Sequence, residues 1–219
     1  MQSPTYVQEL ETLSPTAPAR ILTDRADMAN GQIPLQIIYS FVSLRGKSGA
    51  GLVIAFTSAR RQEGVTLMVR QLGRQLASYC RQDVLIISPS ELERLGVLDV
   101  EQIEVLGHSA APGLWTVPSS NLTELPNSGS PREQEDLWRM LRSRFRYVLI
   151  DCSALETSGE TLSLGPRIDG AVLVVRAGFT SKTEIQNAAR LLSVGSSPFL
   201  GSILNARTYA VPEFLYRML

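Results

Sequence analysis

Leu52-Val-Ile-Ala-Phe56 runs directly into Thr57-Ser-Ala-Arg-Arg-Gln-Glu-Gly64, and Val65 to Leu76 follows. The first segment is a short apolar run of the kind found in buried strands. The second segment is polar and suits a loop, while the third has apolar residues at helical spacing. A loop that leads from a strand into a helix turns backbone N–H groups and the positive helix end toward an anion. Together the three segments predict a phosphate-binding loop.

The loop departs from the usual phosphate-loop pattern at its most important charged position. That pattern is Gly, four residues, and then Gly-Lys-Ser/Thr. Gly64 and Thr66 match its end, but Val65 stands where the lysine belongs. The upstream Gly46-Lys47-Ser48 has the right ending but precedes the strand, and we interpret it as a surface turn. The residues expected to form a weak or vestigial nucleotide loop are Arg60, Arg61, Gln62, Glu63, Gly64, Val65 and Thr66.

Length and composition fit a globular protein with one main domain. The chain has 219 residues, is 19% charged and 44% hydrophobic, and has a formal net charge of zero. This balance gives no electrostatic reason to expect a nucleic-acid partner. No apolar run approaches the roughly 18 residues of a membrane span, and no signal peptide is evident, so we expect a cytoplasmic location. We expect Cys80 and Cys152 to be reduced thiols, and the single histidine, His108, to lie in a surface loop.

Beyond the loop, short apolar strands alternate with amphipathic helices. Residues 1–31 are polar and contain three prolines, so we expect a flexible N-terminal arm there and an α/β domain over 32–219. Ile33–Leu44 is expected to form a helix on the domain edge, and Ser181 with Glu184 forms a capping box before a further helix. The alternation predicts a doubly wound, mostly parallel sheet flanked by helices. The expected later strands are Asp83–Ser88, Gly113–Val117, Tyr147–Asp151, Ile168–Arg176 and Phe199–Asn205.

Several of these segments resemble the bacterial tyrosine kinases of capsule and exopolysaccharide systems, a branch of the MinD/ParA-like P-loop NTPases. The nucleotide loop of that family reads roughly Thr-Ser-Ala-x-Pro-Gly-Glu-Gly-Lys-Ser/Thr, which Thr57–Thr66 matches at six positions. Tyr147–Asp151 is similar to the family's Walker B strand. Ile168–Arg176 closely matches its Val-Asp-Gly-Val-Val-Leu-Val-Val-Arg strand. The resemblance covers about Ile33 to Asn205 and implies a P-loop NTPase-like domain over 32–219 with degenerate nucleotide motifs.

The resemblance also implies that most of the chemistry is missing. The family's second strand ends in two aspartates that serve magnesium and the attacked hydroxyl, and Ser88 and Ser90 stand near those positions. Asp151 is the remnant of a catalytic acid, and with Thr66 it is the remnant of a metal site. Asn205 corresponds to a residue near the adenine base. We therefore expect no catalytic residue, no bound metal, and either no cofactor or weakened binding of ATP with magnesium.

The resulting hypothesis is a catalytically inactive, tyrosine-kinase-like protein that regulates or scaffolds exopolysaccharide or capsule biosynthesis and export. Its expected partner is a membrane-embedded chain-length or export protein or an active kinase relative, which would hold it at the inner face of the membrane. A homo-oligomer is a further expectation. The apolar contacts with the partner are expected to come from Ile37, Ile38 and Phe41. The alternative is that these side chains cover the domain's own sheet. Two alternatives stay open: an active ATP-binding tyrosine kinase or ATPase that uses Arg60, Arg61 and Glu91, and a MinD/ParA-like positioning module.

Overall fold

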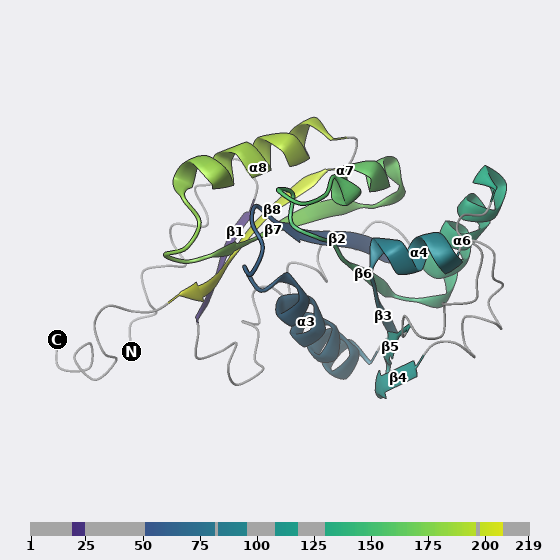
Figure 1. Ribbon diagram of the computed structural model, residues 1–219. Helices are drawn as coiled ribbons and strands as arrows, with labels where there is room; N and C mark the ends of the chain where they lie inside the picture. Colours follow the sequence, from purple (N-terminus) through teal and green to yellow (C-terminus); the bar gives the residue numbers. More distant parts are fainter. Residues whose placement is uncertain are drawn as a thin grey trace, which may run out of the picture.

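The computed structural model describes residues 19–24, 51–81, 83–95, 108–117, 130–195 and 198–207. The strands in these ranges are β1 (Ala19–Asp24), β2 (Leu52–Ser58), β3 (Val84–Ile87), β4 (His108–Ala111), β5 (Leu114–Thr116), β6 (Tyr147–Asp151), β7 (Gly170–Arg176) and β8 (Phe199–Arg207). They form one eight-stranded sheet in the order β1-β8-β7-β2-β6-β3-β5-β4 (Figure 1).

Neighbouring strands run parallel except at one edge, where β4 is antiparallel to β5. The central strand β2 lies between β6 and β7. Ligands of open parallel sheets bind outside the carboxyl ends of the strands, where the chain turns to opposite sides. The carboxyl ends of β2, β3, β6, β7 and β8 all lie at that edge. The predicted doubly wound, mostly parallel sheet is confirmed.

Helices cover both faces of this sheet. α3 (Val65–Cys80) supplies one hydrophobic layer. The opposite layer receives side chains from α4 (Pro89–Leu95), α6 (Pro131–Arg144), α7 (Glu160–Leu164) and α8 (Lys182–Val194), and a short 3-10 helix, Gly165–Arg167, follows α7. Figure 1 shows α3 below the sheet and α7 and α8 above it.

The central strand contributes alternate side chains to the two layers, as the two-residue period of a strand requires. Val53 and Ala55 belong to the layer of α4, α6, α7 and α8, whereas Ile54 and Phe56 belong to the layer of α3. All four side chains are completely buried. The apolar run at the start of the phosphate-loop segment is therefore the centre of the core.

A close backbone approach fixes the amino end of β2. The Gly51 N–H donates to the carbonyl oxygen of Arg142 at 2.8 Å, and a Cβ at Gly51 would overlap the carbonyl oxygen of Phe145. The Arg142 guanidinium pairs with the Asp169 carboxylate at 2.6 Å, and this carboxylate accepts the Val53 N–H at 2.7 Å. The position before β2 must therefore be a glycine.

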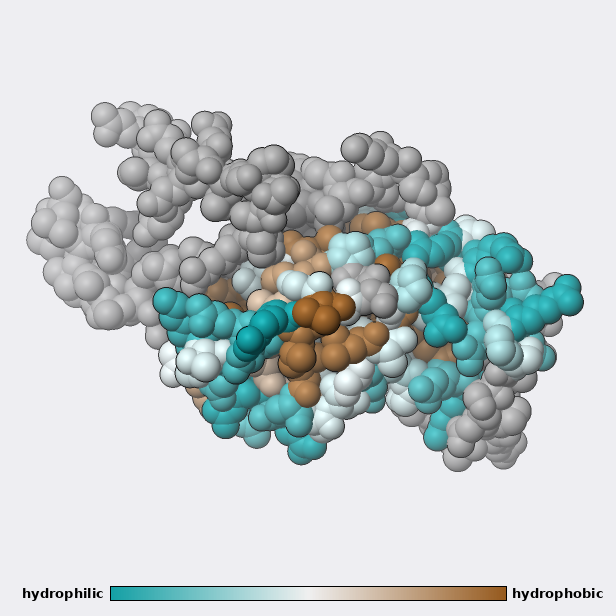
Figure 2. All heavy atoms as spheres, turned by 90° about the horizontal axis from the view of Figure 1, so that it is seen from above, coloured by the Kyte–Doolittle hydropathy of each residue, from teal (hydrophilic) through white to brown (hydrophobic). Residues whose placement is uncertain are grey.

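The helix α8 begins at a capping box and leaves apolar side chains in solvent. The Ser181 hydroxyl accepts the Glu184 N–H at 3.2 Å, and the Glu184 carboxylate accepts the Ser181 N–H at 2.8 Å, as predicted. Leu191 and Val194 of this helix are 50% and 82% exposed. Figure 2, which views the molecule from above, shows apolar side chains gathered among hydrophilic ones on this face.

Two sequence-based expectations need correction. Ala19–Asp24, within the expected flexible arm, pairs in parallel with β8 and forms an edge strand of the sheet. His108, expected in a loop, begins β4, which pairs with β5. The rest of 1–31 and the expected helix Ile33–Leu44 lie outside the described residues. Among the residues that are described, no helix is both long enough and apolar enough to cross a membrane.

Candidate functional site

The loop between β2 and α3 is shaped by two residues with left-handed backbone. Gly64 is the N-cap of α3 with φ 90°, and Gln62 has φ 65°. A Cβ at Gly64 would overlap the side-chain amide of Asn205. Both the left-handed backbone and this close contact therefore require a glycine at position 64. The N-cap position carries no side chain that satisfies the first N–H groups of the helix. α3 therefore begins directly at the end of the loop, without a side-chain cap.

Asn205 lies near the carboxyl end of β8 and contacts the backbone of this loop. Its Nδ2 donates to the carbonyl oxygen of Glu63 at 2.8 Å, and the residue is only 5% exposed. Its Oδ1 is buried without a hydrogen-bond partner among the described residues. The structure thus brings Asn205 to the loop, where its amide is bound to the loop backbone.

The Glu63 side chain connects the loop with the end of the strand β7. Its carboxylate accepts the Arg60 N–H at 2.8 Å and the Arg176 N–H at 3.0 Å. The side chain is almost fully buried, and burial raises the pKa of this carboxyl above its usual range, although those two hydrogen bonds oppose the rise. Glu63 therefore acts as a structural tie between the loop and the end of β7.

Val65 has no access to a ligand of the loop because it belongs to the core. Its side chain is 9% exposed and packs in the α3 layer with Ile54, Phe56 and Met68. A lysine in this position of a phosphate loop donates charged hydrogen bonds to the phosphates. The valine supplies apolar contact to the first turn of α3 in place of that charge.

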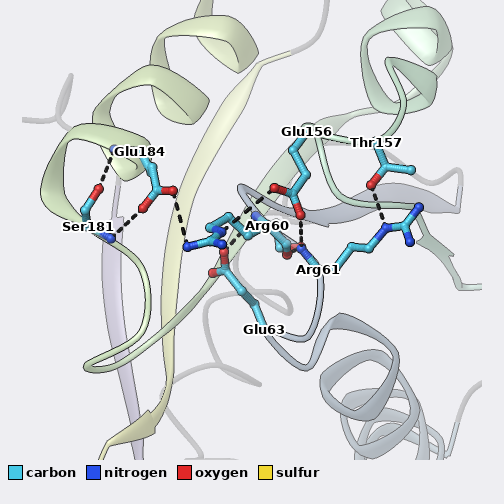
Figure 3. A network of polar contacts seen from close by, with 8 residues as sticks. Arg60, Arg61, Glu63, Glu156, Thr157, Ser181 and Glu184 are labelled. Carbon is cyan, nitrogen blue, oxygen red and sulfur yellow. Dashed lines mark hydrogen bonds and ion pairs between the residues drawn. The ribbon is translucent and has the colours of Figure 1, made fainter.

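The two arginines of the loop extend toward other parts of the chain (Figure 3). Arg60 lies 3.5 Å from the Glu184 carboxylate and 3.8 Å from that of Glu156. Its guanidinium also stacks on the Phe179 ring at 5.2 Å from the centroid. The Arg61 Nε donates to the Thr157 hydroxyl at 3.0 Å, and the Arg61 N–H donates to the Glu156 carboxylate at 2.7 Å. Both guanidinium groups have intramolecular partners.

Thr66 and Asp151, the expected remnants of a metal site, do come together. Asp151 ends β6 beside Phe56 of β2, and the Thr66 side chain lies close enough to its carboxylate to affect the pKa of Asp151. Burial raises the pKa of Asp151, the charge of Glu91 adds to that rise, and Thr66 with the charge of Arg70 opposes it. The structure therefore brings together the two residues that the sequence placed at a metal site.

The residues after β3 serve the next helix instead of a metal ion. The Glu91 carboxylate accepts the Ser88 N–H at 2.7 Å, and the Ser88 hydroxyl accepts the Glu91 N–H at 3.3 Å. This reciprocal pair is a capping box for α4. The Ser88 and Ser90 hydroxyl oxygens lie 3.1 Å apart. Glu91, considered as a replacement acid, is therefore engaged in capping.

These residues do not fit magnesium and ATP. Val65, at the position expected for the lysine, is buried in the core. Ser88 and Ser90 stand after β3, where the resemblance would place two aspartates. The N–H groups of Arg60 and Arg61, which face an anion in a phosphate loop, already donate to carboxylates. Within the described ranges, no group of three His, Cys, Asp or Glu side chains is placed to hold a metal ion.

The sequence matches no family model and no curated protein. Solved structures do match. The chimerical protein CapA2B2 aligns with 94% of this chain and 100% of its own at 16% identity, with a TM-score of 0.66. The kinase domain of the Escherichia coli tyrosine kinase ETK aligns with 97% and 99% at 16% identity, with a TM-score of 0.59. The chain has the fold of these proteins.

A ParA family ATPase from Chlorobium tepidum shares this fold as well, over 76% of this chain and 78% of that one, at 16% identity and a TM-score of 0.58. The predicted fold, that of the MinD/ParA-like branch containing the bacterial tyrosine kinases, is thus confirmed. At these identities the likeness establishes the fold, and the chemistry must be inferred from the site itself.

Sequence reasoning missed the residues that hold the loop. These are Glu156 after β6, Arg176 at the end of β7, Phe179 after β7, and the side-chain role of Glu184. Glu184 was identified only as a helix cap. Arg176 belongs to a recognised strand motif, but the motif does not indicate its contact with the loop. Glu156 and Phe179 have no spacing or motif signal, because their contacts with the loop form only when the strand ends meet.

Proposed function

We propose that this chain is a catalytically inactive, tyrosine-kinase-like protein that acts as a regulatory or scaffolding partner in exopolysaccharide or capsule biosynthesis and export. The observation that carries the proposal is the burial of Val65 at the position of the P-loop lysine. A charged hydrogen bond contributes about 1.5–3 kcal/mol. The loss of the charged hydrogen bond that a lysine would make to phosphate therefore weakens ATP binding roughly ten- to a hundredfold.

The metal-binding residues support the same proposal. Phosphoryl transfer depends mainly on positioning and on charges that stabilise the transition state. Among the described residues the Thr66–Asp151 pair is in place for that purpose, whereas Ser88 and Glu91 cap α4. Burial also raises the pKa of Asp151, which disfavours the charged form that a metal ion needs.

An active kinase or ATPase with relocated charges is the second candidate, and the Thr66–Asp151 pair favours it. Arg60 and Arg61 would then have to replace the lysine. Their contacts with Glu156, Glu184 and Thr157 oppose that role, because each guanidinium would first have to leave its partner. The fold match with a ParA family ATPase supports a positioning module as a third candidate.

A role in binding other proteins does not require the loop to bind a nucleotide or to catalyse a reaction. The proposed partner is a membrane-embedded chain-length or export protein or an active kinase relative, which holds this chain at the inner face of the membrane. The apolar side chains of Leu191 and Val194, exposed on α8, support a role in protein contact. The segment Ile33–Leu44, proposed as a further contact, lies outside the described residues.

Incubation with radiolabelled ATP and magnesium tests the absence of catalysis. We expect neither label on the protein nor released phosphate above a heat-inactivated control. Label or hydrolysis above that control would overturn the proposal in favour of the second candidate.

Capture from native membranes tests the partner. We expect the intact chain to recover a polysaccharide-export component or an active kinase, and Phe41→Asp to recover less. Recovery of neither component would contradict the proposed partner. If Phe41→Asp unfolds the domain, Phe41 belongs to the chain's own core.

A further inference from the structure

A carboxylate from another part of the chain lies on the nucleotide loop. Glu156 follows β6 in a turn, and its Oε1 accepts the Arg61 N–H at 2.7 Å, while its Oε2 lies 3.8 Å from the Arg60 Nε (Figure 3). Glu156 thereby contacts one backbone donor and one cation of the loop. Phosphate groups are bound by the same two kinds of donor.

Backbone hydrogen bonds place this carboxylate. The Leu155 N–H donates to the Ser58 carbonyl at 2.8 Å, and the Glu156 N–H donates to the Ala59 carbonyl at 3.2 Å. The turn after β6 is therefore attached directly to the start of the loop. The backbone of residue 156 is thereby held beside the loop, within reach of the Arg61 N–H for a glutamate side chain.

The cation that Glu156 contacts is itself restrained. Arg60 lies between Glu156 and Glu184 and stacks on Phe179, and the Arg176 guanidinium lies 5.0 Å from the centroid of the same ring. These contacts connect the loop with the end of β7 and the start of α8. The ion pairs are partly exposed, with 43% of the Arg60 side chain and 43% of the Glu156 side chain accessible. Solvent screening makes such pairs weak, so a competing anion can displace them.

We propose that Glu156 is an internal occupant of the nucleotide loop that competes with the phosphate groups of a ligand. A phosphate entering the loop has to displace the carboxylate from the Arg61 N–H and from Arg60, or else bind against a like charge. The inference rests on the proposed function of this loop as a vestigial nucleotide site. It adds that the low affinity is set by Glu156 as well as by Val65.

Calorimetric titration of the full chain with ATP and, separately, with tripolyphosphate tests the proposal at low salt and without magnesium. Glu156→Ala removes the charge and the acceptor, and we expect affinity for both ligands to rise about tenfold. Glu156→Gln keeps an acceptor for the Arg61 N–H and removes only the charge, so we expect a smaller rise of about threefold. Glu135→Gln, an exposed position on α6, is the charge-matched control and should leave both affinities unchanged.

Equal affinities of the wild type and both Glu156 variants would overturn the proposal. A gain for ATP without a gain for tripolyphosphate would also overturn it, because the competition has to act on phosphate groups. Either result leaves the proposed lack of catalysis standing. Conversely, phosphate transfer by the wild type would refute the proposed function, even if Glu156→Ala still strengthens tripolyphosphate binding.

Hydrogen exchange at the Arg61 amide gives a readout that needs no ligand. The 2.7 Å hydrogen bond predicts slow exchange in the wild type and in Glu156→Gln, and at least tenfold faster exchange in Glu156→Ala. Equal exchange in the wild type and Glu156→Ala would show that the carboxylate does not lie on the loop in solution, and the proposal would fail.

Discussion

Replacing Val65 with lysine restores the P-loop charge at the expense of the core. Val65 is 9% exposed and packs against the α3 face of the sheet. Burying a valine side chain contributes about 1.5–3 kcal/mol. A charged ammonium group is not stable in that position, so the lysine has to turn outward and leave its apolar contacts. We expect Val65→Lys to lower the free energy of unfolding by about 2–3 kcal/mol, or roughly 4–12 °C in Tm.

Urea denaturation followed by circular dichroism measures this change, and Leu67→Lys is the matched control. Leu67 lies two residues further along the same helix turn but is 50% exposed. The control adds the same charge near the loop with little loss of burial, so we expect a change within about 0.5 kcal/mol. If Val65→Lys is as stable as Leu67→Lys, then Val65 does not pack in the core, and the main support for the proposed function is lost.

Val65→Lys should strengthen nucleotide binding when it is combined with Gln62→Gly. The second substitution removes the backbone strain of a residue with a Cβ at φ 65°. The restored lysine provides charged hydrogen bonds to phosphate, so we expect ATP affinity to rise at least tenfold in a calorimetric titration. No gain in the folded double variant would mean that the loop does not present its N–H groups to a phosphate.

Three further predictions concern stability. Gln62→Gly should stabilise the protein by about 0.5–1 kcal/mol in urea denaturation, because φ 65° strains a residue with a Cβ; a loss of stability would contradict this backbone conformation. Asp151→Asn should be more stable than the wild type at pH 7, with a difference that shrinks on acidification. Burial raises the folded-state pKa of Asp151, so the native wild type binds the proton more tightly than the unfolded chain and gains stability as the pH falls through that pKa; a difference that grows toward low pH would refute this. Gly51→Ala should cost about 3 kcal/mol because its Cβ overlaps the Phe145 carbonyl oxygen, whereas Gly159→Ala, with no atom near the added Cβ, should change stability by less than about 1 kcal/mol in the same assay.

The sequence was sufficient for the core of the fold because periodicity carries that information. The apolar strands β2, β6 and β7 and the capping box of α8 appear close to where the pattern predicts them. The edge strand Ala19–Asp24 could not be recognised, since it follows Pro15 and Pro18 and is defined by its pairing with β8. A strand at the edge of a sheet has a weaker pattern of its own than a strand in the centre.

The candidate site was predictable only where the parallel sheet itself places the residues. Gly64 and Asn205 meet because the ends of β2 and β8 share one edge of the sheet, and Thr66 meets Asp151 for the same reason. Glu156 could not be found in this way. It lies 95 residues from Arg61 in the sequence, and the turn that presents it has no recognisable motif.

The contacts at the strand ends explain how the loop between β2 and α3 keeps its shape without a bound ligand. In a working nucleotide site the bound phosphates satisfy the N–H groups of the loop. Here Glu63 accepts the Arg60 N–H and Glu156 accepts the Arg61 N–H, while Asn205 binds the Glu63 carbonyl. Each of these bonds supplies a partner from within the chain. The loop conformation therefore depends on the protein's own carboxylates and amide, and it should persist in the absence of any ligand.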